Sequence, residues 1–235
     1  GDSEQALEHA ELAMAGCRER NDLTRAAACE GLRAEAWVDK DELEKALDAF
    51  SSARVLYDAT GQDYDALRCE IRSAMVHHHM GDFGQAARIN RRLVDAFSGS
   101  DDLADDLRYS IVRLLDNLVE DGLHADCLEV AEHGMEAWPE GVTADATYRE
   151  FLGLYALALE ATGRAELATS IAGHVIGHAP AREASQGVAY CYEVRGRSQL
   201  DQDEASASRD LSHAIALHLA RGRVDRARDL SKYFL

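Results

Sequence analysis

The chain repeats one sequence unit along its whole length, at intervals of about 40 residues. A small residue recurs near the start of each copy, and successive copies place it 40, 41, 41 and 39 residues apart. These positions are Ala46, Ala86, Cys127, Ala168 and Ala207, and an earlier copy begins at Ala6. Such a period is typical of stacked supersecondary units that cannot bury their apolar faces alone. Because such arrays act through the surface that they present, we expect catalytic motifs to be scarce.

Each period divides into two helix-like stretches. Apolar residues recur at helical spacing over residues 27–38 and again over residues 43–56, with Asp39-Lys40-Asp41 between the two stretches. Gly61 and Asn21 each follow a helical stretch and suit the left-handed conformation that ends a helix. Tight turns recur at residues 80–82, 121–123 and 162–164, whereas the turn at residues 200–203 is the least regular. Short turns force neighbouring helices to lie antiparallel.

These patterns predict an all-α fold. Only two prolines occur, Pro139 and Pro180, and Ala, Leu, Glu and Arg are abundant, as in a chain that is helical throughout. We expect one array over residues 1–235, with about five complete repeats and partial units at both ends. The clearest loops are predicted at residues 98–102 and 139–143, and no linker divides the chain.

The repeated positions resemble the tetratricopeptide repeat (TPR). The resemblance covers essentially the whole chain and rests on small, aromatic, glycine and proline residues at recurring places. These are Ala34, Trp37, Ala46, Phe50, Ala53, Ala74, Gly81, Ala86, Gly122, Cys127, Pro139, Ala156, Gly163, Ala168 and Pro180. The resemblance implies a right-handed α-solenoid of antiparallel helix pairs, a TPR-like superhelix. Arg195, where a small residue belongs, and Asn90, where a large apolar one belongs, depart from the pattern.

The resemblance also implies a function. Proteins of this family are non-catalytic scaffolds that bind a protein or peptide in the inner groove of the solenoid. The period is longer than the usual 34 residues and looks like the extended repeats of bacterial regulatory proteins. The alternative is therefore a domain that senses a ligand or signal peptide and controls a separate output domain, of the transcription-regulator or diguanylate cyclase type.

The charge of the chain excludes some partners. The formal net charge is −18, which argues against nucleic acid and against anionic membrane surfaces, since both require basic patches. No apolar run approaches the length of a membrane span, and no signal-peptide pattern is present. The five cysteines are odd in number and lie within helical patterns, so we expect reduced, small core residues. These features favour a cytoplasmic protein.

Two groups of histidines are candidates for chemistry, and both are better explained as ordinary helix residues. His77, His78 and His79 are consecutive, and consecutive helical residues point about 100° apart, so the three cannot converge on one metal ion. His174 and His178 share a helix face, but only Glu183 is near enough in sequence to complete a site. No phosphate loop, nucleophile motif or zinc-protease motif occurs. We therefore expect no enzyme activity, no metal and no cofactor.

The resemblance places candidate partner-binding residues on the first helix of each repeat, facing the inner groove. They are Glu35, Val38, Asp39, Arg68, Ile71, Met75, His78, His79, Tyr109, Val112, Asp116, Glu120, Leu157, Glu160 and Tyr192. Arg68 is the only strong cation at these positions, and the set of Lys, Arg and Asn residues that forms the family's carboxylate clamp is absent. We therefore expect a protein or peptide partner that is cationic or apolar.

The two ends of the sequence lack the polar capping helices that solenoids need. The apolar positions near Ala6 and near Tyr233 would be exposed in an isolated array. We therefore expect either a fragment of a longer protein or a homodimer that pairs through an uncapped end.

Overall fold

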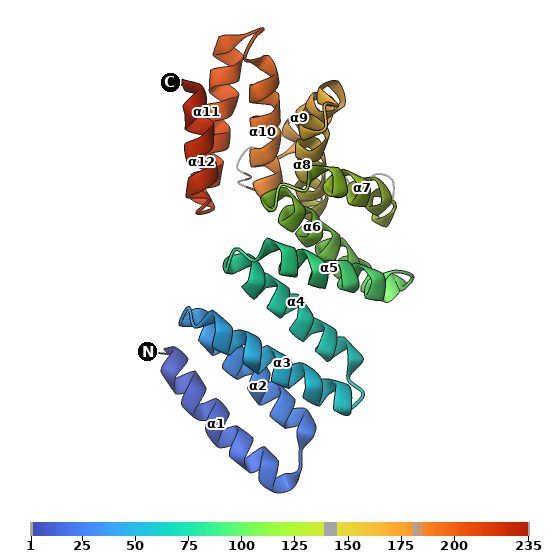
Figure 1. Cartoon of the computed structure of the whole chain (residues 1–235), viewed down its shortest axis with the longest axis vertical. Helices are drawn as coiled ribbons and strands as arrows, with labels where there is room; N and C mark the ends of the chain where they lie inside the picture. Colours follow the sequence, from blue (N-terminus) through green and yellow to red (C-terminus); the bar gives the residue numbers. More distant parts are fainter. Residues whose placement is uncertain (1, 139–144, 181–182, 184, 235) are drawn as a thin grey trace. The chain divides into compact units, whose positions relative to one another are not determined.

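The computed structural model describes residues 2–138, 145–180, 183 and 185–234 (Figure 1). All regular structure in these residues is helical, as the sequence predicts. The α-helices are α1 (Asp2–Arg20), α2 (Leu23–Asp39), α3 (Leu43–Ala59), α4 (Asp63–His79), α5 (Phe83–Phe97), α6 (Ala104–Glu120), α7 (His124–Gly134), α8 (Ala146–Ala161), α9 (Ala165–His178), α10 (Gln186–Gln199), α11 (Glu204–Ala220) and α12 (Val224–Ser231). Short 3-10 turns lie at Asp101–Leu103, Met135–Ala137 and Lys232–Phe234.

The chain forms two compact units, residues 1–96 (unit 1) and residues 97–235 (unit 2). Each unit is an all-α helical repeat in which short turns join many of the consecutive helices, such as α2 to α3 and α8 to α9. The single array over residues 1–235 stays a prediction. The loop expected at residues 98–102 is partly the 3-10 turn that begins at Asp101, and the loop expected at residues 139–143 lies outside the described residues.

The same turn closes most of the helices. One residue has a positive φ, as at Asn21, Asp41, Gly61 and Gly81, and the next amide donates to the carbonyl five residues earlier. In unit 1 these N···O distances are 2.9 to 3.0 Å. This geometry satisfies carbonyls that a helix end leaves free, which is why glycine or asparagine recurs there. The predicted left-handed caps at Asn21 and Gly61 are confirmed.

The repeated small residues lie where helices pack most closely. Ala46, Ala86, Cys127, Ala168 and Ala207 are all fully buried. In unit 1, Ala46 belongs to a core cluster with Ala34, Ala49, Phe50 and Val76. A methyl or thiol at these places lets two backbones approach, which a longer side chain would prevent.

In unit 2 the helix α8 is the centre of the core. Every residue from Phe151 to Leu159 is buried, since α6, α7, α9 and α10 all pack against this helix (Figure 1). Trp138 packs on Phe151 with ring centroids 4.5 Å apart. The helices that face one another across this unit are α6, α8, α10 and α12, the first helices of successive repeats.

The cysteines behave as core residues. All five have free thiols, and four of them are buried: Cys17, Cys69, Cys127 and Cys191. Burial raises the pKa of the Cys127 thiol to about 12, so this thiol stays protonated at neutral pH. Among the described residues, no helix combines the length and apolar character that crossing a membrane requires.

The close packing at the small residues gives a first prediction. Ala46→Leu adds volume to a fully buried site and should destabilise the protein by about 1–3 kcal/mol. The matched control is Ala28→Leu on α2, which is exposed and should change stability by less than about 0.5 kcal/mol. Urea unfolding followed by circular dichroism measures both; equal stability of the two variants would contradict the assigned packing.

Candidate functional site

A network of buried charges joins α6 to α12 in unit 2. The carboxylate of Asp116 is 1% exposed and lies 3.1 Å from Nη2 of Arg223, the residue that immediately precedes α12. Gln186 Nε2 donates to the same carboxylate at 2.8 Å, and the Tyr190 hydroxyl donates at 3.3 Å. Arg223 also pairs with Glu120 one turn further along α6. Arg223 therefore neutralises the charge of Asp116 although the two residues are more than a hundred positions apart in the sequence.

A second buried carboxylate, Glu193 on α10, holds the next arginine of α12. Arg226 donates to it from Nε at 2.9 Å and from Nη2 at 3.0 Å, and Arg197 lies 2.8 Å away. His218 Nε2 lies 3.1 Å from the same carboxylate. A carboxylate only accepts hydrogen bonds, so a hydrogen bond between the two requires a proton on Nε2. Burial alone would raise the pKa of Glu193, but the hydrogen bond from His218 and the two arginines lower it to about 2.

A pair of glycines sets the distance between α8 and α10. A Cβ atom built on Gly153 would lie 2.4 Å from the carbonyl oxygen of Gly187. One built on Gly187 would lie 2.3 Å from the carbonyl oxygen of Arg149. Because neither glycine has a side chain, the two helices approach closely enough for Arg197 on α10 to pair with Glu160 on α8 through two nitrogens.

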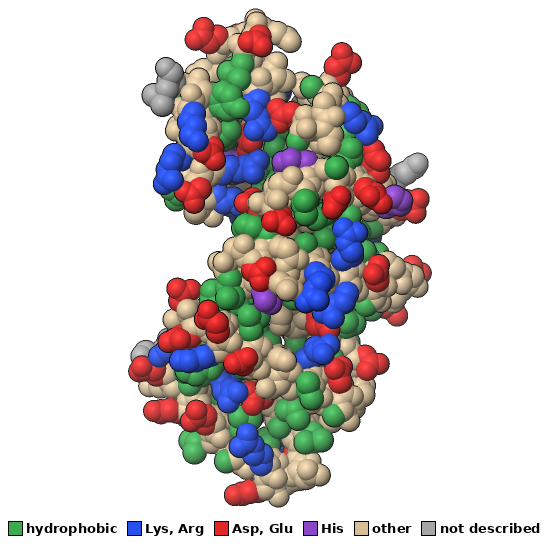
Figure 2. All heavy atoms as spheres, viewed as in Figure 1, with side chains coloured by type: hydrophobic (Ala, Val, Ile, Leu, Met, Phe, Trp, Pro, Cys, Tyr) green, Lys and Arg blue, Asp and Glu red, His purple; other side chains and the backbone are tan. Residues whose placement is uncertain are grey.

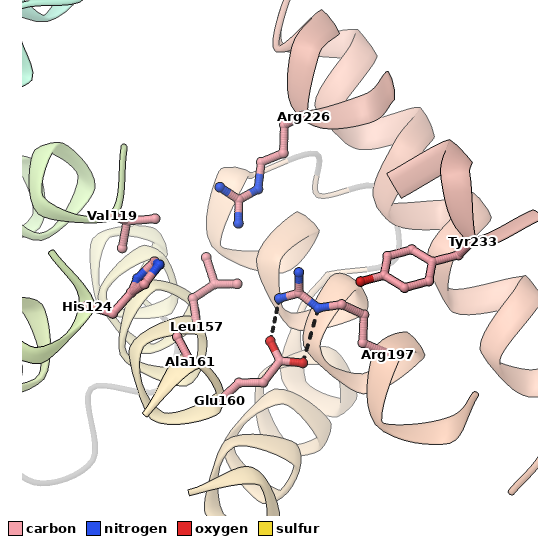
Figure 3. Close-up of a pocket in the computed structure, with 8 residues that line it drawn as sticks. All are labelled: Val119, His124, Leu157, Glu160, Ala161, Arg197, Arg226 and Tyr233. Carbon is pink, nitrogen blue, oxygen red and sulfur yellow. Dashed lines mark hydrogen bonds and ion pairs between the residues drawn. The ribbon is translucent and has the colours of Figure 1, made fainter. Parts of the chain in front are cut away.

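These helices surround a pocket of about 430 Å³ (Figure 3). Its lining is Val119, His124, Leu157, Glu160, Ala161, Arg197, Arg226 and Tyr233. The apolar side chains lie on α6 and α8, whereas the arginines come from α10 and α12 (Figure 3). The pocket therefore has an apolar wall and a cationic wall.

Burial and the neighbouring arginines shift the pKa values of two lining residues, Glu160 and His124, in opposite directions. Burial raises the pKa of Glu160 although Arg197 pairs with it. Burial, with added repulsion from Arg226 and Arg197, lowers the pKa of His124, so its ring is neutral at neutral pH. The positive potential of the two arginines therefore reaches the side of the pocket that His124 lines.

Two of the predicted groove residues, Leu157 and Glu160, line this pocket, and Asp116 and Glu120 form the ion pairs of the adjoining network. Val112 is buried, and the Tyr109 ring lies 5.7 Å from the Arg113 guanidinium. Tyr192 lies elsewhere: its ring stacks on His213 of α11 with centroids 5.1 Å apart.

The side chains of α10 that join the network are Gln186, Tyr190, Glu193 and Arg197. The sequence prediction placed Tyr192 of the sixth repeat in the groove, but a different face of α10 points towards the network. The cause is the turn that ends α10, because residues 200–203 contain no positive-φ residue and do not match the other turns.

The predicted residues of α2 in unit 1 lie partly in ion pairs and partly against the core. Glu35 pairs with Arg72 Nε of α4 at 2.8 Å. Val38 is half-buried and packs against the Phe50 cluster, and Asp39 is exposed.

The predicted residues of α4 are more exposed. Arg68 lies 3.4 Å from Asp65, and His79 is exposed. Ile71 and Met75 are half-buried, and the half-buried His78 meets Phe83 edge-on with ring centroids 5.2 Å apart. The described residues of this unit contribute no side chain to the pocket.

Sequence reasoning missed the cations of the site. Arg197, Arg223 and Arg226, which are not among the predicted groove positions, pair with acids on the inner face of unit 2. His124 and Tyr233 were also missed as lining residues. The available signal was the recurrence of arginine in 223–228, the start of another first helix, although the pattern gives no indication of which acids those arginines meet.

The histidine candidates do not form a metal site. His174 and His178 lie with ring centroids 4.3 Å apart, and His178 Nδ1 is 2.8 Å from the His174 carbonyl. Glu183 pairs with Arg149 at 2.7 Å. Among the described residues, no group of three or more His, Cys, Asp or Glu side chains is arranged to hold a metal ion.

No model of a known protein family matches the chain, and no curated protein matches its sequence. Solved structures do match its fold. YrrB, described as a TPR protein with an unusual peptide-binding site, aligns over 92% of this chain and 98% of its own, with a TM-score of 0.57 and 16% identity. A putative kinesin light chain of Podosopora anserina with nearly identical TPR-like repeats aligns over 86% and 98%, with a TM-score of 0.62 and 12% identity.

BtubC (BKLC) from P. vanneervenii aligns over 100% of this chain and 92% of its own, with a TM-score of 0.52 and 14% identity. At these identities the likeness concerns the fold alone. The fold is a TPR-like, all-α helical-repeat solenoid, which confirms the class predicted from the repeat.

The glycine contact gives a second prediction. Gly187→Ala forces a methyl group into the backbone of α8 and should destabilise the protein by about 1–3 kcal/mol. The matched control is Gly173→Ala in α9, where a Cβ meets nothing within 4 Å and should stabilise the helix by about 0.5–1 kcal/mol. Glycine-to-alanine substitution is thus expected to lower the free energy of unfolding at position 187 and to raise it at position 173, as measured by urea unfolding. A stabilising effect at both positions would contradict the close approach of α8 and α10.

The low pKa of Glu193 gives a third prediction. A carboxyl group whose pKa falls from 4.5 to about 2 on folding stabilises the folded state above pH 4.5 and loses that contribution as pH falls towards 2. Glu193→Gln should therefore lose stability at pH 6, and its deficit relative to the wild type should shrink by about 3 kcal/mol as pH approaches 2. The control is Glu129→Gln on α7, an exposed carboxyl group. Urea unfolding at several pH values measures the difference; a Glu193→Gln deficit independent of pH would contradict the ion pairs.

Proposed function

We propose that the chain is a non-catalytic binding module that holds a peptide or protein segment against the first helices of its repeats. The observation that carries the proposal is the pocket in unit 2, whose walls come from α6, α8, α10 and the α12 region. The likeness in fold to YrrB, a TPR protein with a peptide-binding site, supports it.

The chemistry of the partner follows from the charges. In unit 2 the carboxylates of Asp116, Glu120 and Glu160 are each paired with an arginine of the same unit, so a cationic segment would have to displace those pairs. The apolar wall, with Leu157 at its centre, favours a segment that inserts an apolar side chain. A cationic segment is better matched by unit 1, where Asp39 is exposed.

The alternative is a regulatory domain that controls a separate output domain. One observation favours it: Arg223 and Arg226 of α12 pair with acids of α6 and α10, so a ligand that competes for these arginines would change how three helices are held together. A cytoplasmic location and pairing of two copies through an uncapped end remain part of the proposal.

Selection from a display library of random short peptides tests the binding function. The affinity of an enriched peptide should fall at least about tenfold in Tyr233→Ser, because a half-exposed aromatic ring at a pocket rim contributes contact area on binding. The matched control is Tyr64→Ser on α4 of unit 1; the two tyrosines are 48% and 46% exposed.

Hydrogen exchange locates the bound peptide. Protection should appear on α6, α8, α10 and α12 and at the start of α7, where His124 lines the pocket, whereas α9 and α11 should exchange as in the free protein. Failure to enrich any peptide, or protection confined to α9 and α11, would contradict the proposal.

A further inference from the structure

Four polar side chains converge on the pocket from separate segments. Arg197 comes from α10, Arg226 from α12, Tyr233 from the 3-10 turn that follows α12, and His124 from the start of α7. Figure 3 shows the Arg226 guanidinium reaching into the space between Val119 and Arg197, and the Tyr233 hydroxyl pointing towards Arg197. Figure 2 shows Lys and Arg side chains beside acidic ones around α12.

Arg226 and Tyr233 bring hydrogen-bond donors to the pocket. Arg226 bonds Glu193 through Nε and Nη2, but its Nη1 lies 3.8 Å from Glu120, beyond hydrogen-bond distance. Tyr233 also lines the pocket, and its side chain is 48% exposed. A guanidinium nitrogen and a hydroxyl group at one pocket are well suited to a carboxylate oxygen.

The described lining of the pocket carries two arginines, Arg197 and Arg226, and one acid, and Glu193 outside the lining also pairs with Arg226. Glu160, the one acid in the lining, already accepts from Arg197 through both oxygens. Glu120, which pairs with Arg223, is not among the residues that line the pocket. Burial is the main cause that lowers the pKa of His124, and the charges of Arg226 and Arg197 add to it, so this smaller contribution reflects the positive charge at this wall.

The opposite wall is apolar. Val119 and Leu157 are buried at the back of the pocket, and Ala161 ends α8 at its rim. The volume of about 430 Å³ lies within the range of small-molecule sites, roughly 300–1,000 Å³. A ligand that fills it needs an apolar body and one anionic end.

We propose that this pocket binds a small organic acid, with its carboxylate on Arg226 and the Tyr233 hydroxyl and its apolar body against Val119, Leu157 and Ala161. Binding of the acid goes beyond the binding of a protein segment and does not depend on it, because a free acid needs only the pocket, although a peptide that inserts a side chain there would compete with the acid. The same chemistry exists at the C-terminus of a peptide, so the experiment separates the two sources.

Calorimetry with octanoate and octanamide tests the anionic end. Both probes have the same apolar chain, and only octanoate carries a charge, so octanoate should bind at least tenfold more tightly. Nuclear magnetic resonance should show that bound octanoate raises the pKa of His124, because a carboxylate offsets the potential of the two arginines. Equal affinity for the two probes would overturn the proposal. Binding of a short apolar peptide with a free C-terminus, but not of octanoate, would also overturn it.

Paired variants test the location. Ala161→Trp places an indole ring at the rim of the pocket and should abolish octanoate binding. Its control is Ala220→Trp, since Ala220 is likewise exposed and ends a helix, α11, away from the pocket. Tyr233→Phe removes only the hydroxyl group and should weaken octanoate binding severalfold while leaving octanamide unchanged. Octanoate binding that persists in folded Ala161→Trp would place the acid elsewhere and overturn the proposal.

Discussion

Where α8 crosses α10, Gly153 and Gly187 let the two backbones approach to a distance that no Cβ atom would permit. The arrangement of unit 2 depends on this contact. It brings α10 close to α8, so that Arg197 reaches Glu160, and it brings the start of α10 within reach of Asp116 on α6 through Gln186. The small, fully buried residues Ala168 and Ala207 likewise let α9 and α11 approach the neighbouring helices closely. Close backbone packing is thus the condition for the polar contacts of the inner face.

The buried charges are organised around two carboxylates. Removing Asp116 and Glu193 from water carries a large desolvation cost, which is offset only when each is paired and hydrogen-bonded. Both meet this condition: Asp116 has Arg223, Gln186 and Tyr190, and Glu193 has Arg226, Arg197 and His218. Burial, together with the nearby Asp116, raises the pKa of Tyr190 well above its usual range, so its hydroxyl remains a donor. The network therefore fixes the position of α12 against α6 and α10.

This arrangement changes what an acidic solenoid offers to a ligand. The formal charge of the chain is −18, yet the acids of the unit 2 inner face are covered by arginines from its last helices. What remains open is a pocket with an apolar wall on α6 and α8 and arginine donors opposite. Since those arginines also hold helices together, a ligand that bonds to them acts on the same contacts that stabilise the fold.

The sequence by itself determined the helices, their turns and the small residues at their contacts. Each of these features can be read from a short stretch of sequence or from its repetition: a glycine at a positive φ, an apolar face at helical spacing, or a small residue repeated every 39 to 41 residues. The left-handed cap predicted at Gly61 is confirmed for this reason, and the repeated Ala46 and Ala168 are fully buried. For the site, Leu157 and Glu160 were found because the repeat register places them on the first helix of a regular unit.

Only the tertiary structure decided which charges meet. Arg223 and Asp116 are far apart in the chain, and no periodic pattern specifies that a side chain at the start of α12 reaches across to α6. The tertiary structure also decided which face of α10 points towards the charge network. The turn at residues 200–203 lacks the positive-φ residue that marks the register in the other repeats. Tyr192 therefore packs on α11, whereas Tyr190 and Arg197 face the network. The physical reason is that helix formation and turn geometry depend on neighbours in sequence, whereas the pairing of buried charges depends on how closely whole helices approach.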